Sequence, residues 1–252
     1  MGASGVEAME AVEAVETEAR KQAAAMRAVD YVWSGMAVGL GTGSTARFVA
    51  EEIATRVRDG RLRDIVCIPT SERTRALAKE LGIPFATLDG HPHLDLAIDG
   101  ADEVAPNLDV IKGAGGALLR EKIVAAAAAR FIVVVDDSKL VSRLGEKAAV
   151  PIEVVRFGWQ THLSAIESLG GQPVLRTNAD GQPFITDEGH FIVDARFDPM
   201  IDPYAVAEAI RRRPGVVETG LFLGMASIVV VGSAVDIDIL TTEPASRQNQ
   251  PL

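Results

Sequence analysis

Short apolar runs that alternate with helix-type segments constrain the fold of this chain most strongly. Within the first 145 residues, the runs expected as strands are 36–40, 65–68, 94–98 and 131–135, and helices are expected at 16–33, 46–57 and 72–81. Strands that alternate with helices predict a parallel sheet. Ligands of open parallel sheets bind outside the carboxyl ends of the strands. We therefore expect the loops that follow these runs to converge on one site.

The second half of the chain follows a different pattern. Strands are expected at 152–155, 174–177, 184–185, 191–194, 216–222 and 227–231, with helices at 159–169 and 204–212. A β-α-β-β-α-β order predicts a small antiparallel sheet with helices on one face. The expected fold class is thus α/β: a Rossmann-like parallel-sheet domain with a second, smaller, ferredoxin-like α+β domain. We expect the first to comprise 1–145 and 224–252, with loose ends at 1–15 and 241–252, and the second to comprise 146–223.

The loop after the first strand, Gly41-Thr42-Gly43-Ser44-Thr45, has the composition of a phosphate cradle. Its backbone N–H groups and hydroxyls can donate hydrogen bonds to phosphate oxygens at a helix start. A dinucleotide fold would need a further glycine, where Ala46 stands, and an acidic residue after the second strand, where Glu72 is a weak candidate. The nucleotide P-loop needs a lysine that is missing here. A small phosphate ester fits better, although Ser44 and Thr45 could equally be helix caps.

Three carboxylates follow the third strand in the segment Asp99-Gly100-Ala101-Asp102-Glu103. Such a cluster could bind a divalent metal through oxygen, or hold sugar hydroxyls and transfer protons. It could also be an acidic turn whose aspartates bond to the local backbone. His91 and His93 lie upstream, but nothing joins them at metal-ligand spacing, so we expect no metal site.

A glycine-rich turn separates Lys112 from a helix that carries Glu121. Such a turn permits close approach of a ligand, and the two side chains could offer it a cation and a proton acceptor. Alone, the stretch also fits an ordinary strand-to-helix turn with two solvated charges. The neighbours of Glu121 on the helix are apolar, so burial is expected to raise its pKa. Lys122 is expected to be a solvated helix lysine.

Charge and composition restrict the classes of partner. The net charge of −10 argues against nucleic-acid binding, which usually requires a basic surface. A phosphorylated substrate remains compatible, because a positive loop can act locally. The chain has no apolar run long enough to cross a membrane and no secretory or transit signal. Its single cysteine, Cys67, excludes an intramolecular disulfide and fits a reducing, cytoplasmic location.

Taken together, these motifs resemble the signature set of ribose-5-phosphate isomerase, type A. Their order and spacing match, and the similarity extends from about Lys21 to Leu240. The resemblance implies interconversion of D-ribose 5-phosphate and D-ribulose 5-phosphate in the pentose phosphate pathway, without metal or cofactor, in a homo-oligomer. It implies that Glu121 is the proton acceptor. We expect Asp99, Asp102 and Lys112 to complete the catalytic set. The implied substrate contacts are Thr42, Gly43, Ser44, Thr45, Asp99, Gly100, Ala101, Asp102, Lys112, Gly113, Ala114, Gly115 and Lys139.

One position departs from the pattern, because Ala114 stands where many members of that family have glycine. Two other functions remain open from the residues themselves. The chain could act on another sugar phosphate, or it could be a sugar-phosphate sensor. A sensor would usually carry a DNA-binding segment, and neither terminus shows a helix-turn-helix pattern with a basic face. A sensor would also have no need of the pairing of Lys112 with Glu121.

Overall fold

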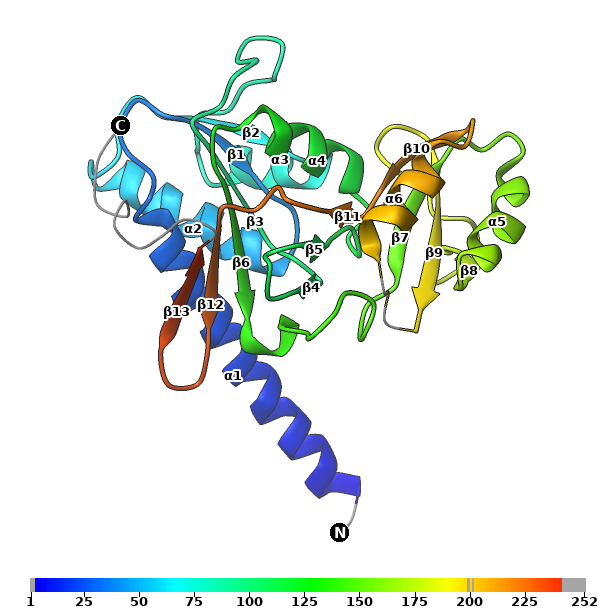
Figure 1. Cartoon of the computed structure of the whole chain (residues 1–252). Coiled ribbons are helices and arrows are strands. Elements are labelled where there is room, and N and C mark those ends of the chain that lie inside the picture. The colour runs from blue at the N-terminus through cyan, green and yellow to red at the C-terminus, as the bar shows by residue number, and fades with distance from the viewer. Residues whose placement is uncertain (1–2, 199, 201, 242–252) are drawn as a thin grey trace.

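A six-stranded sheet forms the centre of the computed structural model, which describes residues 3–198, 200 and 202–241. The strand order is β13-β12-β6-β3-β1-β2 (Figure 1), and every pairing is parallel except that of β12 with the edge strand β13. The parallel α/β sheet is therefore confirmed. The strands are β1 (Ala37–Leu40), β2 (Val66–Pro69), β3 (Leu96–Asp99), β6 (Phe131–Asp136), β12 (Ile228–Gly232) and β13 (Ile237–Thr241).

Both faces of this sheet are buried, which explains why its strands are continuous apolar runs. One face packs against α1 (Ala3–Val29), α2 (Ser44–Arg58) and α3 (Glu72–Glu80). The opposite face packs against α4 (Leu118–Ala127) and a small three-stranded sheet. Residues that alternate along β6 point to the two cores, Ile132 to the first and Val133 to the second.

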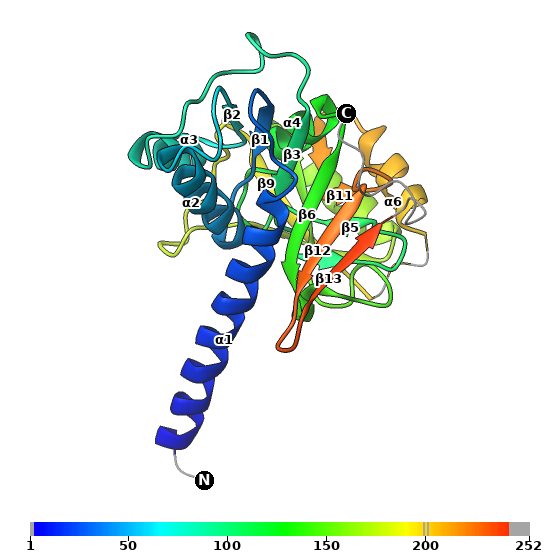
Figure 2. The same ribbon diagram turned by 90° about the vertical axis from the view of Figure 1, so that its left-hand side faces the viewer.

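Helix α1 begins at Ala3, much earlier than the expected start at residue 16, so residues 3–15 are helical and not a loose extension. Its N-terminal part projects beyond the body of the protein (Figure 2). Among the described residues, no helix, α1 included, is both long and apolar enough to span a lipid bilayer. The expected loose tail lies outside the described residues from 242 onward, and Thr241 is the last residue of β13.

The second sheet is antiparallel, in the order β10-β7-β9-β8. Its chain order is β7 (Val150–Val154), α5 (Leu163–Ser168, after the 3-10 turn Trp159–His162), β8 (Gly171–Leu175), β9 (Phe191–Phe197), α6 (Pro203–Arg211) and β10 (Val216–Thr219). This confirms the ferredoxin-like pattern. The prediction of a strand at 184–185 is wrong. The neighbouring Pro183 forms only an isolated bridge with Thr177, and after the bond from Phe184 N–H to Arg176 O the chain turns away, with Thr186 N–H donating to His190 O.

A three-stranded sheet that the sequence did not predict joins the two larger ones. It comprises β4 (Glu103–Val104), β5 (Val110–Ile111) and β11 (Leu221–Phe222), in the order β11-β5-β4. The single strand expected at 216–222 is split at Gly220, whose N–H donates to Pro151 O (2.7 Å) and whose carbonyl accepts from Lys112 N–H (2.9 Å). A side chain at Gly220 would collide with the Lys112 carbonyl, so only glycine fits here.

Candidate active site

Three charged side chains from different elements meet at the carboxyl edge of the parallel sheet. Asp99 is the last residue of β3, Lys112 directly follows β5, and Glu121 lies in the first turn of α4. Lys112 Nζ is 3.0 Å from Asp99 Oδ2 and 3.5 Å from Glu121 Oε2, and each side chain is at most 4% exposed. Burial of one cation between two carboxylates makes each ionisation state depend on the others.

Lys112 is held in one orientation. Its N–H donates to Gly220 O, and its ammonium donates to Gly100 O (2.6 Å) and lies 5.5 Å from the centre of the Phe222 ring. Burial disfavours the ammonium, but the charges of Asp99 and Glu121 outweigh burial and raise the pKa of Lys112. The lysine therefore stays charged, which suits it to stabilise negative charge that develops in the cavity.

Glu121 is the side chain best suited to proton transfer. Burial, opposed by the charge of Lys112 and reinforced by those of Asp99 and Asp102, raises the pKa of Glu121 to about 8. Within the part of the chain that the structure describes, Glu121 Oε2 has no hydrogen-bond partner. A carboxylate with a pKa near neutrality and an oxygen that no hydrogen-bond donor occupies can accept a proton and return it. The expectation that burial raises this pKa is confirmed.

The three carboxylates of the acidic segment, Asp99, Asp102 and Glu103, have different hydrogen-bond partners. Asp99 Oδ1 accepts the N–H groups of Thr42 (3.0 Å) and Gly100 (2.8 Å), and its burial raises its pKa against the effect of Lys112. Asp102 Oδ2 accepts the N–H of Ala114 (3.0 Å). Glu103 is fully buried and accepts three backbone N–H groups, from Gly145, Lys147 and Ala148. These backbone groups lie 42 to 45 residues further along the chain, so Glu103 does not form the local backbone bonds that the alternative of an acidic turn supposed.

The glycine loop after β1 leads directly into α2. Helix α2 begins at Ser44, after Gly43 in a positive-φ conformation (φ 117°), and its first turn carries N–H groups without intrahelical acceptors. The Thr42 hydroxyl, in contrast, bonds to the hydroxyls of Thr70, Ser71 and Thr74, and the Thr42 N–H is bound by Asp99. The donors that remain for an anion are therefore those at and after Gly43.

A cavity of about 220 Å³ connects these groups. Its described lining includes every expected site residue except Asp99, which is buried and reaches the site through Lys112. The lining residues are Lys21, Thr42, Gly43, Ser44, Thr45, Gly100, Ala101, Asp102, Lys112, Gly113, Ala114, Gly115, Glu121 and Lys139.

Lys21 is the lining residue that the sequence reasoning missed. It comes from α1, and its Nζ donates to Ser44 Oγ (3.5 Å) and pairs with Glu18 (3.1 Å). Lys21 precedes the buried Ala24 and Ala25 by three and four residues, so helical periodicity places it on the face of α1 that packs on the protein. This helical spacing was the feature of the sequence that could have identified Lys21 as a residue facing the protein.

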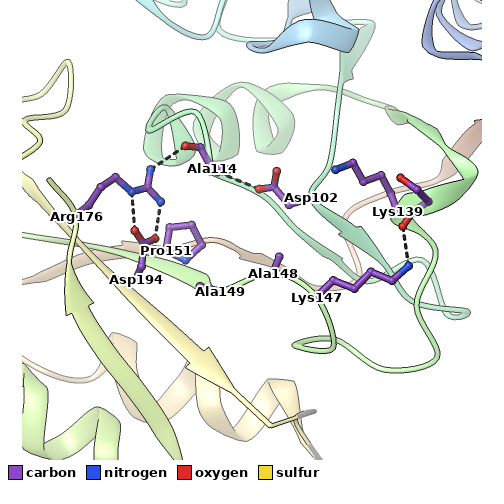
Figure 3. Close-up of a pocket in the computed structure, with 10 residues that line it drawn as sticks. Asp102, Ala114, Lys139, Lys147, Ala148, Ala149, Pro151, Arg176 and Asp194 are labelled. Atoms are coloured by element: carbon purple, nitrogen blue, oxygen red, sulfur yellow. Dashed lines mark hydrogen bonds and ion pairs between the residues drawn. The ribbon is translucent and has the colours of Figure 1, made fainter. Parts of the chain in front are cut away.

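A wider cavity of about 770 Å³ adjoins the first and shares Asp102, Ala114 and Lys139 with it. Figure 3 shows Arg176 and Asp194 on one side of this wider cavity and Lys139 and Lys147 on the other. Lys147 Nζ donates to Ser138 O (2.7 Å) and Leu140 O (3.0 Å) and so fixes the turn that carries Lys139. The wider cavity is thus built by both the parallel and the antiparallel sheet.

Lys122 is not the solvated lysine that we expected. Its side chain is 13% exposed, and its ammonium donates to Glu218 Oε1 (2.9 Å) and to the carbonyls of Thr219 (2.6 Å) and Leu221 (2.8 Å). Burial lowers the pKa of Lys122, against the effect of Glu218. The contacts of Lys122 with Glu218, Thr219, Leu221 and the Phe222 ring tie α4 to β10 and β11.

We expect Lys122→Gln to destabilise the fold. The glutamine cannot pair with the charge of Glu218, and at least one of the two carbonyls loses its donor. Loss of this partly exposed ion pair should lower the free energy of unfolding by roughly 1–3 kcal/mol. Urea unfolding followed by circular dichroism measures this, with Arg212→Ala as the control because Arg212 is exposed and, among the described residues, its ion pair is with the exposed Glu208. Equal midpoints for Lys122→Gln and the wild type would contradict the structural role.

Comparisons with known proteins identify the family of this chain. The family model of ribose 5-phosphate isomerase A (phosphoriboisomerase A) matches residues 66–236. The chain is 56% identical to ribose-5-phosphate isomerase A of Roseiflexus castenholzii over 228 residues, which are 90% of this chain and 97% of that protein. It is 49% identical over 227 residues to a probable chloroplastic ribose-5-phosphate isomerase 3 of Arabidopsis thaliana, covering 88% of this chain and 82% of that one.

Solved structures give the same result. The ribose 5-phosphate isomerase of Plasmodium falciparum superposes with a TM-score of 0.87 at 39% identity, over 90% of this chain and 100% of that chain. A D-ribose-5-phosphate isomerase in complex with phospho-erythronic acid also gives 0.87, at 40% identity over 89% of this chain and 99% of that chain. By sequence and by structure, the chain belongs to the ribose-5-phosphate isomerase A family.

Proposed function

We propose that this chain interconverts D-ribose 5-phosphate and D-ribulose 5-phosphate, a reaction of the pentose phosphate pathway, with Glu121 as the proton acceptor. The observation that carries the proposal is the position of Glu121 Oε2, which accepts no hydrogen bond within the described residues and lies 3.5 Å from the ammonium of Lys112, in a cavity that also contains a helix N-terminus. Family membership supports it, and a solved relative was obtained with a phosphorylated sugar acid, phospho-erythronic acid.

The isomerisation moves one proton between neighbouring carbons. Glu121 removes the proton from C2 of the aldose, the carbonyl electrons move to O1, and an enediolate forms. The same carboxyl returns the proton to C1 while the hydroxyl proton passes from O2 to O1, which gives the C1 hydroxyl and the C2 carbonyl of the ketose. Lys112 stabilises the negative charge on the enediolate oxygens, while Asp99 holds Lys112 in place through the 3.0 Å ion pair. Asp102, which lies on the cavity wall, holds a sugar hydroxyl and assists ring opening.

The carboxylates of the acidic segment support a reaction that uses neither a metal nor a cofactor. Asp99 accepts two N–H groups and pairs with Lys112, Asp102 accepts one N–H group, and Glu103 accepts three. Within the described residues, no group of three or more His, Cys, Asp and Glu side chains is placed to hold an ion. The occupied carboxylates are the physical reason why we propose catalysis by side chains alone.

The phosphate end of the substrate is assigned to the start of α2. The first-turn N–H groups of α2, the hydroxyls of Ser44 and Thr45, and the ammonium of Lys21 all border the cavity there. A helix N-terminus with a nearby lysine favours a doubly charged anion. Lys139, also on the cavity wall, adds a second cation.

We expect Ser44→Asp to raise the KM for ribose 5-phosphate by at least about tenfold, with a smaller effect on kcat. The new carboxylate would repel the phosphate and would pair with Lys21, which now donates to the Ser44 hydroxyl. Ser44→Ala is the matched control, because it removes only one neutral hydroxyl. Initial rates over a range of substrate concentrations separate KM from kcat. An unchanged KM in a folded Ser44→Asp variant would move the phosphate away from this loop.

A sugar-phosphate panel tests the function as a whole. The protein is incubated in heavy water with ribose 5-phosphate, arabinose 5-phosphate, ribulose 5-phosphate and glucose 6-phosphate, and deuterium at the carbon beside the carbonyl is followed by proton NMR. We expect exchange and product only with the ribose and ribulose esters. Binding without exchange for every ester would favour a sensor, and exchange with a different ester would change the assigned substrate.

The remaining aspects of this proposal concern organisation and location. We infer a Rossmann-like catalytic unit of residues 1–145 and 224–252, a smaller unit of 146–223, a homo-oligomer, and a cytoplasmic enzyme that binds neither nucleic acid nor membranes. The net charge of −10 supports the last point. Large exposed apolar side chains, such as Phe157 at 94% exposure, offer surface for association with a second copy. Light scattering after gel filtration measures the molar mass and hence the number of subunits in the oligomer.

A further inference from the structure

The turn that follows Lys112 contains no side chain larger than a methyl group. Residues 113–116 are Gly-Ala-Gly-Gly, and Gly113 (φ 107°) and Gly116 (φ 82°) have positive φ values. Glycine-rich backbone has many accessible conformations, so such a turn needs contacts from elsewhere to remain ordered. This turn lies between the cation of the site, Lys112, and the helix that carries the proton acceptor, Glu121.

The contacts come from the antiparallel sheet. Arg176 directly follows β8, and its Nη1 donates to Gly113 O (2.9 Å) and to Ala114 O (3.0 Å). Its Nε and Nη2 pair with the two carboxylate oxygens of Asp194 on β9, at 2.8 and 2.5 Å. Figure 3 shows the guanidinium between Asp194 and the turn. The Phe184 ring adds a second contact, because a side chain at Gly116 would collide with it.

The geometry of one peptide unit connects Arg176 to the site. The Gly113–Ala114 peptide donates its N–H to Asp102 Oδ2 (3.0 Å) and accepts Arg176 at its carbonyl. Rotation of this peptide would break both bonds at once. The cationic donor at the carbonyl also polarises the peptide and strengthens the bond from its N–H to Asp102. Arg176 is 14% exposed on its side chain and Asp194 is 27% exposed, so the pair is largely shielded from solvent.

We infer that Arg176, oriented by Asp194, is a positioning residue that fixes the Gly113–Ala114 peptide and thereby holds Asp102 and Lys112 in register with the substrate. This inference rests on the proposed function, because it assigns Arg176 a part in the same reaction. Arg176 itself does not act on the reacting carbons. A planar guanidinium is needed because it bonds to two carbonyls on one side and to both oxygens of a carboxylate on the other.

The test compares Arg176→Ala and Arg176→Lys with the wild-type enzyme, with Arg212→Ala as the control from the same antiparallel unit. Displacement of Asp102 and Lys112 from their catalytic positions lowers turnover, so kcat should fall roughly 10- to 100-fold in Arg176→Ala. KM should change by less than about threefold, because the phosphate contacts are untouched. Arg176→Lys should retain only part of the activity. Asp194→Asn should show a smaller loss in the same direction.

Chemical rescue separates positioning from a merely structural contribution. The wide cavity beside Arg176 leaves room for a small cation, so low millimolar methylguanidinium should restore part of the kcat of Arg176→Ala. It should not change the wild type or Arg212→Ala, and methylamine should restore less. Wild-type kcat in Arg176→Ala would overturn the inference. So would a raised KM with unchanged kcat, which would make Arg176 a substrate ligand, and so would a loss of kcat that methylguanidinium leaves unchanged.

Amide hydrogen exchange keeps this test independent of the assigned substrate. In the wild type, the Ala114 amide should be protected, and in Arg176→Ala exchange of the peptide that covers 113–117 should increase by more than the loss of global stability measured by urea unfolding explains. If the wild type does not convert ribose 5-phosphate, the proposed function fails, and the exchange data still decide whether Arg176 orders the turn. Unchanged exchange in Arg176→Ala would overturn the inference in either case.

Discussion

Glu121→Gln is expected to lower kcat by roughly 10²–10⁴-fold, the usual contribution of a general base. The amide keeps the shape of the carboxyl group but cannot accept the C2 proton. Substrate affinity should stay equal or rise, because a negative charge beside an anionic sugar phosphate is removed. Isothermal calorimetry with ribose 5-phosphate measures the affinity, and loss of the C2 proton signal in heavy water measures the chemical step.

The control for this variant must make the same chemical change at a site without a role. Lys122→Gln cannot serve, because Lys122 anchors α4 to β10 and β11. Glu80→Gln is suitable, because Glu80 is an exposed residue at the end of α3, on another helix. If Glu121→Gln exchanges the C2 proton at the wild-type rate, Glu121 is only a helix acid, and Asp102 becomes the next candidate for the base.

The loops of the site could be predicted from the sequence because each follows an apolar strand. The carboxyl ends of parallel strands share one edge of the sheet. Thr45, Asp99 and Lys139 could therefore be predicted to lie at the same edge, even though the strand order was not known from the sequence. Glu121 could be predicted to be buried from the apolar residues one turn away on its helix. These inferences depend on periodicity and topology, which the local sequence determines.

The parts that were missed depend on contacts between distant segments. Strand β4 has two residues, so it carries no alternation that a sequence window detects, and the pairing of β5 with β4 and β11 depends on segments far apart in the sequence. The split at Gly220 is visible only when Pro151 and Lys112 are known to flank it. Arg176 looks like any arginine at the end of an edge strand, and its partners lie 62 and 63 residues away at Ala114 and Gly113. Lys122 was wrongly predicted to be solvated for a related reason, because its three acceptors come from residues 218–221.

The pH dependence of the wild type should report Glu121. A general base acts only when it is unprotonated, so kcat/KM should fall as the pH decreases through the pKa of Glu121, about 8 in the free enzyme, and level off above it. A glutamate of ordinary pKa would instead keep the profile flat down to about pH 5. The position of the acid limb therefore distinguishes a buried base from a solvated one.

Lys112→Met should lower kcat by roughly 10²–10³-fold, the effect of removing one preorganised charge from an oxyanion site. It should also shift the acid limb of the kcat/KM profile to higher pH. The sign follows from the causes of the shift: burial and the carboxylates of Asp99 and Asp102 raise the pKa of Glu121, and only Lys112 opposes them. Without the ammonium, the protonated form of Glu121 is favoured further, so more alkaline conditions are needed to generate the base.

The shift in pH separates the two roles of Lys112. Loss of oxyanion stabilisation alone would lower the whole profile without moving it, whereas loss of the ion pair moves the acid limb. Lys112→Gln is the second variant, since its amide can still donate to Gly100 O while it carries no charge. Because both variants leave Asp99 and Glu121 buried without a cation, urea unfolding must first show that they are folded at the assay temperature. A profile that stays at the wild-type position in folded variants would show that Lys112 does not set the ionisation of Glu121, and the raised pKa would then arise from burial and the neighbouring carboxylates alone.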